Sequence, residues 1–394
     1  MLFSFLCPAK TCAGVNALDH LAFELDAMGA SKPMVIQDKA SHDAGLTKKL
    51  KQAFSGSGMT MGISGPAPED PDSQAAAMFV RSLYDCFQEK GYDALVALGG
   101  KAAAQAAKAL NIAVSLGPEA LTSKEIFQPL APLVFLPTGT DAYDGTTRVT
   151  QFNGHPLSSP HLSPDLVMID PRLMLTDDRN LLLDRALTCL AAGCEIFALS
   201  PAPPARAYAA TIVCLARSAL ASLLASGLKG PDNLKAAARE NARIHNTLVQ
   251  ASVMTGYLMS QDAPIVSLAL GRAIAGRGRA PLGQIMVIVL PAVLESRPST
   301  ALGDLYLHLS TPDAFASVPA SQQPLAAVYE IRNITHTLFS LSHGLLPRTL
   351  GEAGWSMDAL ESLRDDIKNA FGLTDPKTLT RIMARALDGR PMGN

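Results

Sequence analysis

The chain has 394 residues, of which 48% are hydrophobic and 17% are charged, and its formal net charge at pH 7 is −2. This length and composition favour a soluble, enzyme-sized protein of two domains with alanine-rich helical cores. Long runs of like charge are absent from the sequence, which argues against partners such as nucleic acid or a charged membrane surface.

Cysteine usage and the N-terminal segment favour a cytoplasmic location. No CxxC pair occurs, and the cysteines lie mostly in apolar segments, at Cys7, Cys12, Cys86, Cys189, Cys194 and Cys214. Scattered thiols are typical of a reducing compartment. The first residues, MLFSFLCPA, have no basic residue before the apolar run, so we expect no signal peptide. The longest apolar run, near 285–294, contains Pro291 and is too short to span a bilayer.

In the first 170 residues, short apolar runs alternate with helical patterns. Helices are expected at 44–54 and 73–90 and directly after the glycines at 99–100. Strands are expected at 33–38, 59–63, 93–98, 133–136 and 166–169. Strands separated by helices predict a parallel sheet that helices cover, as in Rossmann-like domains.

After Asp170 and Pro171 the pattern becomes helical, as in the series Ile244, Leu248, Ala251 and Thr255. Near the chain's end, an aspartate–proline pair at 375–376 predicts the start of a further helix. We find no convincing strand in this part. The expected domains are therefore an α/β domain at 1–170 and an all-α domain at 171–394, with a ligand cleft between them.

The stretch LGGKAAAQAAK, residues 98–108, combines the end of a strand, a glycine turn and the start of a helix. Such a turn can bind phosphate through the N–H groups at the start of the helix. Taken alone the motif is weak, because it lacks the GxGxxG pattern. An alanine-rich helix that simply packs after a strand is the structural alternative.

Several segments together resemble the iron-containing (group III) alcohol dehydrogenase family. In order they are MVIQDKA, LGGKAAAQAAKA, FLPTGTDAYDGTT, LVMIDPRLMLT, PLGQIMVIVLPAVLES and DPKTLTRIMARAL. The family includes glycerol dehydrogenase and maleylacetate reductase and is related in fold to dehydroquinate synthase. The resemblance covers nearly the whole chain and implies NAD(P) bound by the first of two domains.

The resemblance also implies a set of cofactor-binding residues. Asp38 ends the first expected strand, where a carboxylate would accept the ribose hydroxyls of NAD(H) and repel the 2′-phosphate of NADP(H). Glycines at 99 and 100 would let backbone N–H groups approach the pyrophosphate. The whole set is Asp38, Gly99, Gly100, Lys101, Thr138 and Thr140. For each threonine, a plain turn is the alternative.

The chain departs from the family pattern at the glycine turn and in the loop after it. Lys101 follows the two glycines, and Gln105 takes the place of the family's aspartate. Asp141 and Asp144 occur in the loop where the family runs on as GTGSE. Lys101 could pair with a phosphate, whereas the two aspartates would repel one, so cofactor binding stays open.

The family's metal site has no counterpart in this sequence. In the family an aspartate and three histidines hold iron or zinc, which polarises the substrate oxygen. Aligned on Glu195, Gly276 and Gly283, those positions fall at Thr188, Ala192, Leu268 and Leu282. No histidine lies between His161 and His245 or between His245 and His308, so small alignment errors restore no ligand. We therefore predict no metal.

Other candidate ligands lack a credible spacing for a metal. Core packing or a solvated helix face is the simpler interpretation of Cys189, Cys194, His155, His161, His245, His336 and His343.

One cationic stretch, GRAIAGRGRAPLG, occurs where the family has histidines. Arg272 falls at a position that often carries an active-site histidine, and Arg277 and Arg279 follow it. Guanidinium groups bind carboxylates or phosphates and can stabilise a developing oxyanion without a metal. A solvated loop is the alternative.

Two functions remain open from the sequence. The first is a metal-independent oxidoreductase that transfers hydride between NAD(H) and a small anionic carbonyl or alcohol, with Arg272 as the electrophile. The second is a non-catalytic paralogue kept as a ligand- or protein-binding scaffold. Its partner would be a small anionic molecule, and a homodimer is left open.

Overall fold

The structure is a computed structural model that describes all residues except 1–2, 4, 8, 123–125, 176–177, 226–233, 262–264, 278–279, 298, 365–366, 368–375 and 391–394. Of the sequence-based expectations, those for Arg279 and Asp375 lie outside the described residues. The chain divides into two compact units. A helical unit contains Met1–Phe5, Asp178–Ala251 and Gln261–Asn394, and an α/β unit contains Leu6–Asp177 and Ser252–Ser260.

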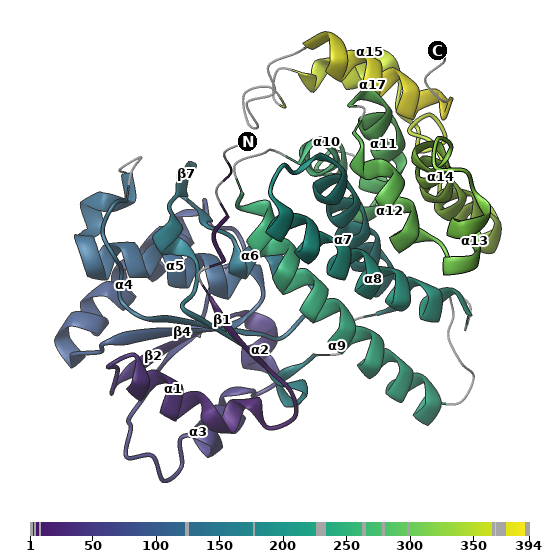
Figure 1. Cartoon of the computed structure of the whole chain (residues 1–394). Coiled ribbons are helices and arrows are strands. Elements are labelled where there is room, and N and C mark those ends of the chain that lie inside the picture. The colour runs from purple at the N-terminus through teal and green to yellow at the C-terminus, as the bar shows by residue number, and fades with distance from the viewer. Residues whose placement is uncertain are drawn as a thin grey trace. The chain divides into compact units, whose positions relative to one another are not determined.

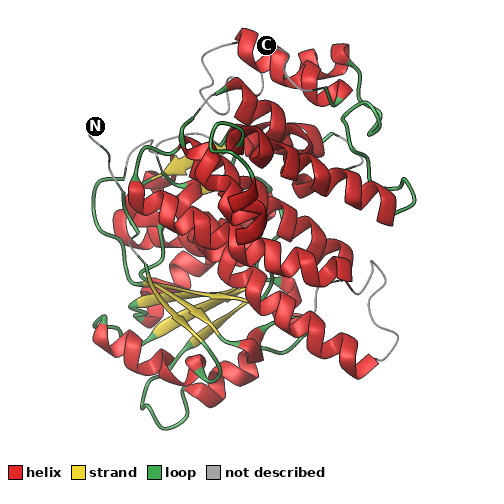
Figure 2. Ribbon diagram, turned by 45° about the vertical axis from the view of Figure 1, so that its right-hand side comes forward, coloured by secondary structure: helices red, strands yellow, loops and turns green. Residues whose placement is uncertain are grey.

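The α/β unit is built on a six-stranded parallel sheet (Figures 1 and 2). Its spatial order is β1 (Lys10–Ala13), β8 (Leu166–Ile169), β5 (Leu133–Pro137), β4 (Ala94–Gly99), β2 (Pro33–Gln37) and β3 (Gly62–Pro66). Every residue of β2, β4, β5 and β8 is buried. Strands with both faces covered have continuous apolar sequences, which explains why the four central strands were recognisable.

Helices cover both faces of this sheet (Figure 1). On one face, η1 (Ala17–His20), α1 (Leu21–Ala27) and α3 (Thr47–Ala53) pack on the sheet through a core that includes Leu21, Leu50 and Val96. On the other face lie α4 (Gln74–Lys90) and α5 (Lys101–Leu116). The smaller elements are α2 (Lys39–Asp43), η2 (Pro118–Thr122), α6 (Tyr143–Thr146), the hairpin β6 (Val149–Phe152)–β7 (His155–Ser158), η3 (Pro160–Leu162) and η4 (Pro171–Leu173).

Two expected elements have different bounds in the structure. The helix expected at 44–54 begins only at Thr47, as α3, because Gly45 has φ +66° and separates it from α2. The strand expected at 59–63 begins instead at Gly62 and ends at Pro66. Strand β1 and the hairpin β6–β7 were not expected. Both are short and largely exposed, so their sequences carry little apolar signal.

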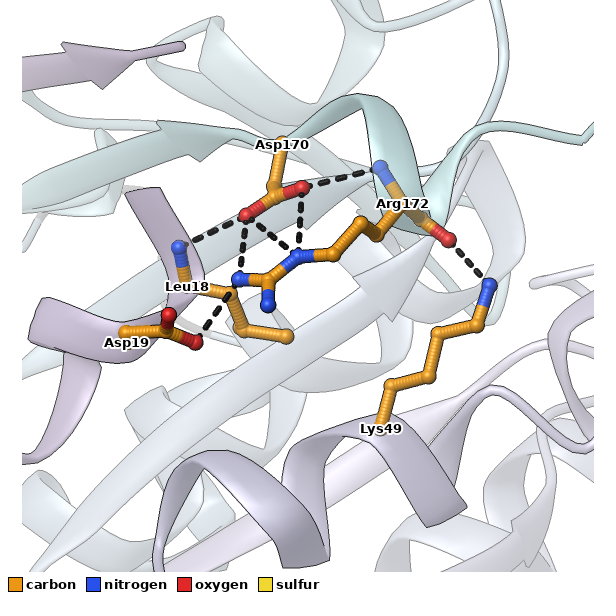
Figure 3. A network of polar contacts seen from close by, with 5 residues as sticks. All are labelled: Leu18, Asp19, Lys49, Asp170 and Arg172. Atoms are coloured by element: carbon orange, nitrogen blue, oxygen red, sulfur yellow. Dashed lines mark hydrogen bonds and ion pairs between the residues drawn. The ribbon is translucent and has the colours of Figure 1, made fainter. Parts of the chain in front are cut away.

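A network at the end of β8 fixes this edge of the sheet to the helices beside it (Figure 3). The buried Asp170 carboxylate accepts the backbone N–H of Leu18 at 2.9 Å and the Nη2 of Arg172 at 2.8 Å. Arg172 also pairs with Asp19, and its carbonyl accepts a hydrogen bond from Lys49 of α3. Burial alone would raise the pKa of Asp170, but these hydrogen bonds outweigh burial and lower it.

In the helical unit, every element among the described residues is a helix (Figure 2). They are α7 (Arg179–Leu199), α8 (Pro203–Ala225), α9 (Leu234–Met259, whose last residues belong to the α/β unit), α10 (Val266–Ala275), α11 (Leu282–Ser296), α12 (Ala301–Leu309), α13 (Pro312–Ser317), α14 (Gln323–Leu341), α15 (Met357–Ser362) and α17 (Pro376–Asp388). The predicted order, an α/β sheet domain followed by a helical domain, is thus confirmed.

By length and composition alone, α8 would be able to cross a membrane. It packs along α7 and α12, however, and buries Ile212, Val213 and Leu220 there. Its Arg217 donates to the carbonyls of His308 at 2.9 Å and Ser310 at 2.6 Å. Helix α8 is therefore packed as a core helix of the helical unit.

Candidate functional site

The sheet topology singles out the carboxyl ends of β2 and β4. From β2 the chain passes to β3 on one side and then to β4 on the other. Open α/β sheets bind ligands at such a switch point, outside the carboxyl ends of the strands. Asp38 directly follows β2, and Gly100 directly follows β4. The structure therefore brings three of the predicted cofactor residues, Asp38, Gly99 and Gly100, together at this point.

The glycine turn is held by the Asp38 carboxylate. Oδ2 accepts the N–H of Gly100 at 2.6 Å, and Oδ1 accepts the N–H of Ser41 at 2.8 Å, which caps α2. Gly99 has φ +143°, and a Cβ there would collide with the Asp38 carboxylate, so only glycine suits this position. Each carboxylate oxygen has lone pairs for a second donor, so holding the turn does not exclude contact with a ribose.

A second carboxylate approaches the same turn. A Cβ built on Gly100 would lie 2.7 Å from Oδ2 and 2.9 Å from Oδ1 of Asp141. The first N–H groups of an α-helix have no intrahelical acceptor and attract anions. At α5, the chain thus supplies two carboxylates of its own, from Asp38 and Asp141.

The other predicted cofactor residues differ in accessibility. Lys101 is exposed in the first turn of α5. Thr138 and Thr140, by contrast, are 2% and 1% exposed. The hydroxyl of Thr138 lies 3.3 Å from that of Ser41, and its carbonyl accepts the N–H of Leu175 at 2.8 Å. Both threonines are therefore buried in this structure, and Thr138 has local hydrogen-bond partners.

Lys108 is a buried cation that the sequence interpretation missed. It is 1% exposed on α5, and its Nζ donates to the carbonyls of Asp144, Thr147 and Val149 at 3.1, 2.7 and 3.3 Å. Burial lowers the pKa of Lys108 to about 7. The lysine thereby fastens the loop after Asp141 to α5. Within an alanine-rich helix it resembled an ordinary solvated lysine, and only the loop's position reveals its role.

The four positions aligned with the family's metal ligands lie in helices of the helical unit. The hydroxyl of Thr188 donates to the carbonyl of Asp184 at 2.8 Å, within α7. The aliphatic side chains of Ala192, Leu268 and Leu282 have no atom that can bind a metal. These residues do not fit an iron or zinc ion. Within the described parts of the chain, no group of three or more His, Cys, Asp or Glu side chains gathers that could hold one.

Two buried carboxylates near these positions cap helices instead. Oδ1 of Asp184 accepts the N–H of Gly283, at the start of α11, at 2.6 Å. The oxygens of Glu195 accept the N–H groups of Val266 and Ser267, at the start of α10, at 2.6 and 2.9 Å. Burial raises the pKa of both acids. Both acids therefore have a structural explanation.

The predicted cationic residues lie at the end of α10. Arg272 is exposed in the last turn of the helix, and Arg277 is exposed just beyond it. Cys189 and Cys194 are buried in α7, as core packing predicts, and burial raises the pKa of the Cys194 thiol. Among the histidines, His245 is 5% exposed, whereas His336 and His343 are exposed.

Comparison with known proteins agrees with this architecture. Residues 8–171 match a family model described as iron-containing alcohol dehydrogenase. The fold resembles that of a 1,3-propanediol oxidoreductase, with a TM-score of 0.78 and 18% identity over 98% of this chain and 100% of the other. The α/β part of the chain is therefore similar to the iron-containing alcohol dehydrogenase family.

Two further similar proteins bear on the cofactor. An NAD-dependent methanol dehydrogenase of Bacillus methanolicus is 24% identical over 213 residues, or 51% of this chain, and the match spans 54% of that enzyme's length. The sulfoacetaldehyde reductase of Bifidobacterium kashiwanohense, solved in complex with NAD+, has a TM-score of 0.74 at 15% identity over 99% of this chain and 100% of the other. At such low identity, the solved structures show the shared fold alone.

Proposed function

We propose that this protein is an NAD(H)-dependent oxidoreductase that interconverts a small anionic carbonyl compound and its alcohol without a metal. The observation that carries the proposal is the glycine turn at the switch point, with Asp38 and the first turn of α5 beside it. The names of the methanol dehydrogenase and the sulfoacetaldehyde reductase support NAD(H) as the cofactor.

Asp38 would select NAD(H) over NADP(H). Its carboxylate is 8% exposed and already accepts two backbone N–H groups, which hold it at the turn. A 2′-phosphate beside it would meet a like charge in a partly desolvated position, which costs several kcal/mol. The ribose hydroxyls of NAD(H) would instead donate to the remaining lone pairs.

Titration of the purified protein with NADH and with NADPH tests the cofactor proposal. We expect NADH to bind more tightly, with binding followed by calorimetry and by nicotinamide fluorescence. The variant Asp38→Asn should lose most of the preference. Tighter binding of NADPH would contradict the role of Asp38, and binding of neither would contradict the oxidoreductase proposal.

Arg272 is the proposed electrophile. Bound NADH would supply the hydride to the carbonyl carbon. As the carbon–oxygen π electrons move onto oxygen, the Arg272 guanidinium would stabilise the negative charge, and the oxygen would then take a proton from water. A guanidinium can also pair with a carboxylate or phosphate of the substrate, which is why an anionic substrate is proposed.

The substrate proposal is tested by the unfolding temperature in the presence of keto acids, dicarboxylates and phosphates. The best ligand should lose roughly 2–5 kcal/mol of binding free energy in Arg272→Ala if the guanidinium pairs with it in a desolvated site. The exposed Arg239 on α9 provides the control Arg239→Ala. A neutral alcohol as the best ligand, or equal effects of both variants, would contradict the role of Arg272.

A non-catalytic paralogue is the second candidate, and the position of Asp141 favours it. This carboxylate lies beside Gly100, where a pyrophosphate would otherwise receive the N–H groups of α5. Protein that binds neither NADH nor NADPH but still binds small anions would support the paralogue.

The cellular compartment, the partners and the oligomeric state of the protein are also proposals. The six cysteines are scattered along the chain without a CxxC pair, and the net charge is −2, which supports a reducing cytoplasm and a small-molecule partner in preference to nucleic acid or a membrane. A homodimer would appear in light scattering of the purified protein as twice the mass of the 41.4 kDa chain.

A further inference from the structure

The helical unit contains a cavity of about 270 Å³ that the oxidoreductase proposal does not use. It lies between α11, α14, the turn after Arg348 and the end of α17. Its floor is formed by α11, through apolar residues such as Val287, Ile288 and Ala292. The volume is at the small end for ligand pockets and suits a molecule of a few carbon atoms.

The walls of this cavity carry an excess of positive charge. The lining contains four guanidinium groups, two carboxylates and one imidazole. They belong to Arg332, Arg348, Arg385 and Arg390, to Glu352 and Asp388, and to His336. Because each guanidinium has five N–H donors, it can hold one carboxylate and still donate to a second anion. Charge and donor count both favour an anionic ligand.

Two of these arginines are held in place by their surroundings. Arg332 pairs with Glu295, with 2.7 Å between Nη2 and Oε1, and both side chains are mostly buried. Arg348 pairs with Glu352 and lies 4.0 Å from the centre of the Phe339 ring. Held side chains lose less rotational freedom when a ligand binds, so the site is partly preorganised.

The helix end at the cavity does not oppose an anion. Carbonyls in the last turn of α17 are already hydrogen-bonded, since Arg385, Ala386 and Leu387 accept the N–H groups of Gly389, Leu350 and Gly351. Because these carbonyls already have donors, the helix end presents less uncompensated negative charge to the cavity.

The floor adds one hydrogen-bond acceptor. Pro291 of α11 has no N–H, so the carbonyl of Val287 cannot make its helical bond to that residue, and both residues line the cavity. We propose that this cavity binds a small dianion, a dicarboxylate or a phosphate, whose oxygens meet the guanidinium groups while a carbon skeleton or hydroxyl contacts the floor.

Calorimetry on the full chain at low ionic strength, with succinate, malate and inorganic phosphate as separate probes, tests the site. We expect at least one probe to bind, and the three arms distinguish a carboxylate from a phosphate ligand. Arg385→Gln and Arg390→Gln should each weaken that binding roughly tenfold or more, whereas Arg381→Gln should not. Arg381 is exposed on the same helix but does not line the cavity.

The variant Arg272→Ala distinguishes binding at the proposed substrate site from binding in this cavity. Anion binding that survives Arg272→Ala and weakens in Arg390→Gln supports the cavity. Binding lost in Arg272→Ala and unchanged in Arg390→Gln overturns it, as does the absence of heat from all three probes. Should Arg385→Gln fail to fold, the exposed Arg390 still decides the result.

Discussion

Asp38 and Asp141 bring two negative charges to the first turn of α5, a position whose N–H groups attract phosphate. The two have different roles in the structure. Asp38 holds the turn through Gly100 and caps α2 through Ser41. The carboxylate of Asp141 approaches Gly100 from the following loop, and Asp141→Asn removes its charge while keeping the size of the side chain.

We expect Asp141→Asn to bind NADH more tightly than the parent protein. Removing a like charge beside a desolvated pyrophosphate should raise affinity roughly tenfold or more. Fluorescence titration measures the change, and the exposed Asp85 on α4 provides the control Asp85→Asn. Parent protein and variant with equal affinity would exclude Asp141 as a barrier, while the cofactor proposal would stand. If neither binds, both proposals fail.

Lys108 gives the protein a pH-dependent stability. Burial lowers its pKa from 10.5 to about 7, so between about pH 7 and pH 10.5 the unfolded chain holds a proton that the folded chain has released. Stability therefore rises with pH across this window, by up to about 1.4 kcal/mol per pH unit. Below about pH 7 both states are protonated, and the full cost of burying the charge is present.

In Lys108→Met this dependence should be lost. Urea denaturation between pH 7 and pH 9.5 gives the free energy of unfolding for both proteins, and the difference between them should change with pH. Lys101→Met, in the exposed first turn of the same helix, should follow the parent curve. If the free energies of unfolding of the parent and of Lys108→Met changed with pH in parallel, the lysine would remain charged beside the carbonyls that accept its hydrogen bonds.

At this scale, the sequence indicates which residues have the right chemistry but not where their side chains go. Asp38, Gly99 and Gly100 were expected at one cofactor site because of the resemblance to the iron-containing alcohol dehydrogenases, and the structure places them together. Their contacts with Asp141 depend on the path of a loop, and that path depends on distant residues. Ser252 of α9, for example, accepts the N–H of Tyr143 at 2.9 Å. Such long-range contacts leave no local pattern in the sequence.

Helix α7 organises the helical unit through two acids on one face. Asp184 and Glu195 are eleven residues apart, about three helical turns, and cap α11 and α10 respectively. Neither α10 nor α11 has a side-chain cap of its own. A buried helix start without acceptors would leave unsatisfied N–H groups. The two carboxylates of α7 are the acceptors that the sequences of α10 and α11 do not provide.

Glu195→Ala should therefore destabilise the protein by roughly 1–3 kcal/mol, since the N–H groups of Val266 and Ser267 lose their acceptors. Glu195→Gln keeps one amide oxygen and should lose about half as much. Urea denaturation followed by circular dichroism measures both. Glu361→Ala, at an exposed position on α15, serves as control. A loss no greater than that of the control would show that water replaces the carboxylate.

Element prediction succeeded where burial produced a strong pattern. The four buried strands and the long helices α4 and α5 were found, since both faces of the strands and one face of each helix are apolar. The helix expected at 44–54 was found as α3, but it begins three residues later than expected, because Gly45 with its positive φ separates it from α2. Strand β1 was missed because its residues are mostly exposed.

For the whole molecule, the fold and the metal chemistry of the family are separate properties. The fold depends on the pattern of apolar strands and helices, and here it resembles a 1,3-propanediol oxidoreductase over 98% of the chain at 18% identity. A metal site depends on four side chains alone. Changing those four side chains leaves the packing pattern intact, so a similar fold does not imply that the metal site is present.

We predict that the protein purifies without stoichiometric iron or zinc. The positions aligned with the family's ligands are occupied by Thr188, Ala192, Leu268 and Leu282, and only the hydroxyl of Thr188 is polar. That hydroxyl already donates to the carbonyl of Asp184. A neutral alcohol oxygen is also a weak ligand compared with carboxylate or imidazole.

Elemental analysis before and after dialysis against a mild chelator, together with the unfolding temperature and NADH binding, tests this prediction. We expect trace metal only, and the same unfolding temperature and NADH affinity before and after chelation. Thr188→Val removes the one polar atom and serves as a second probe, since it should leave any adventitious metal content unchanged. A stoichiometric metal that is lost together with stability would show that the alignment is wrong and that other residues of this chain form the site.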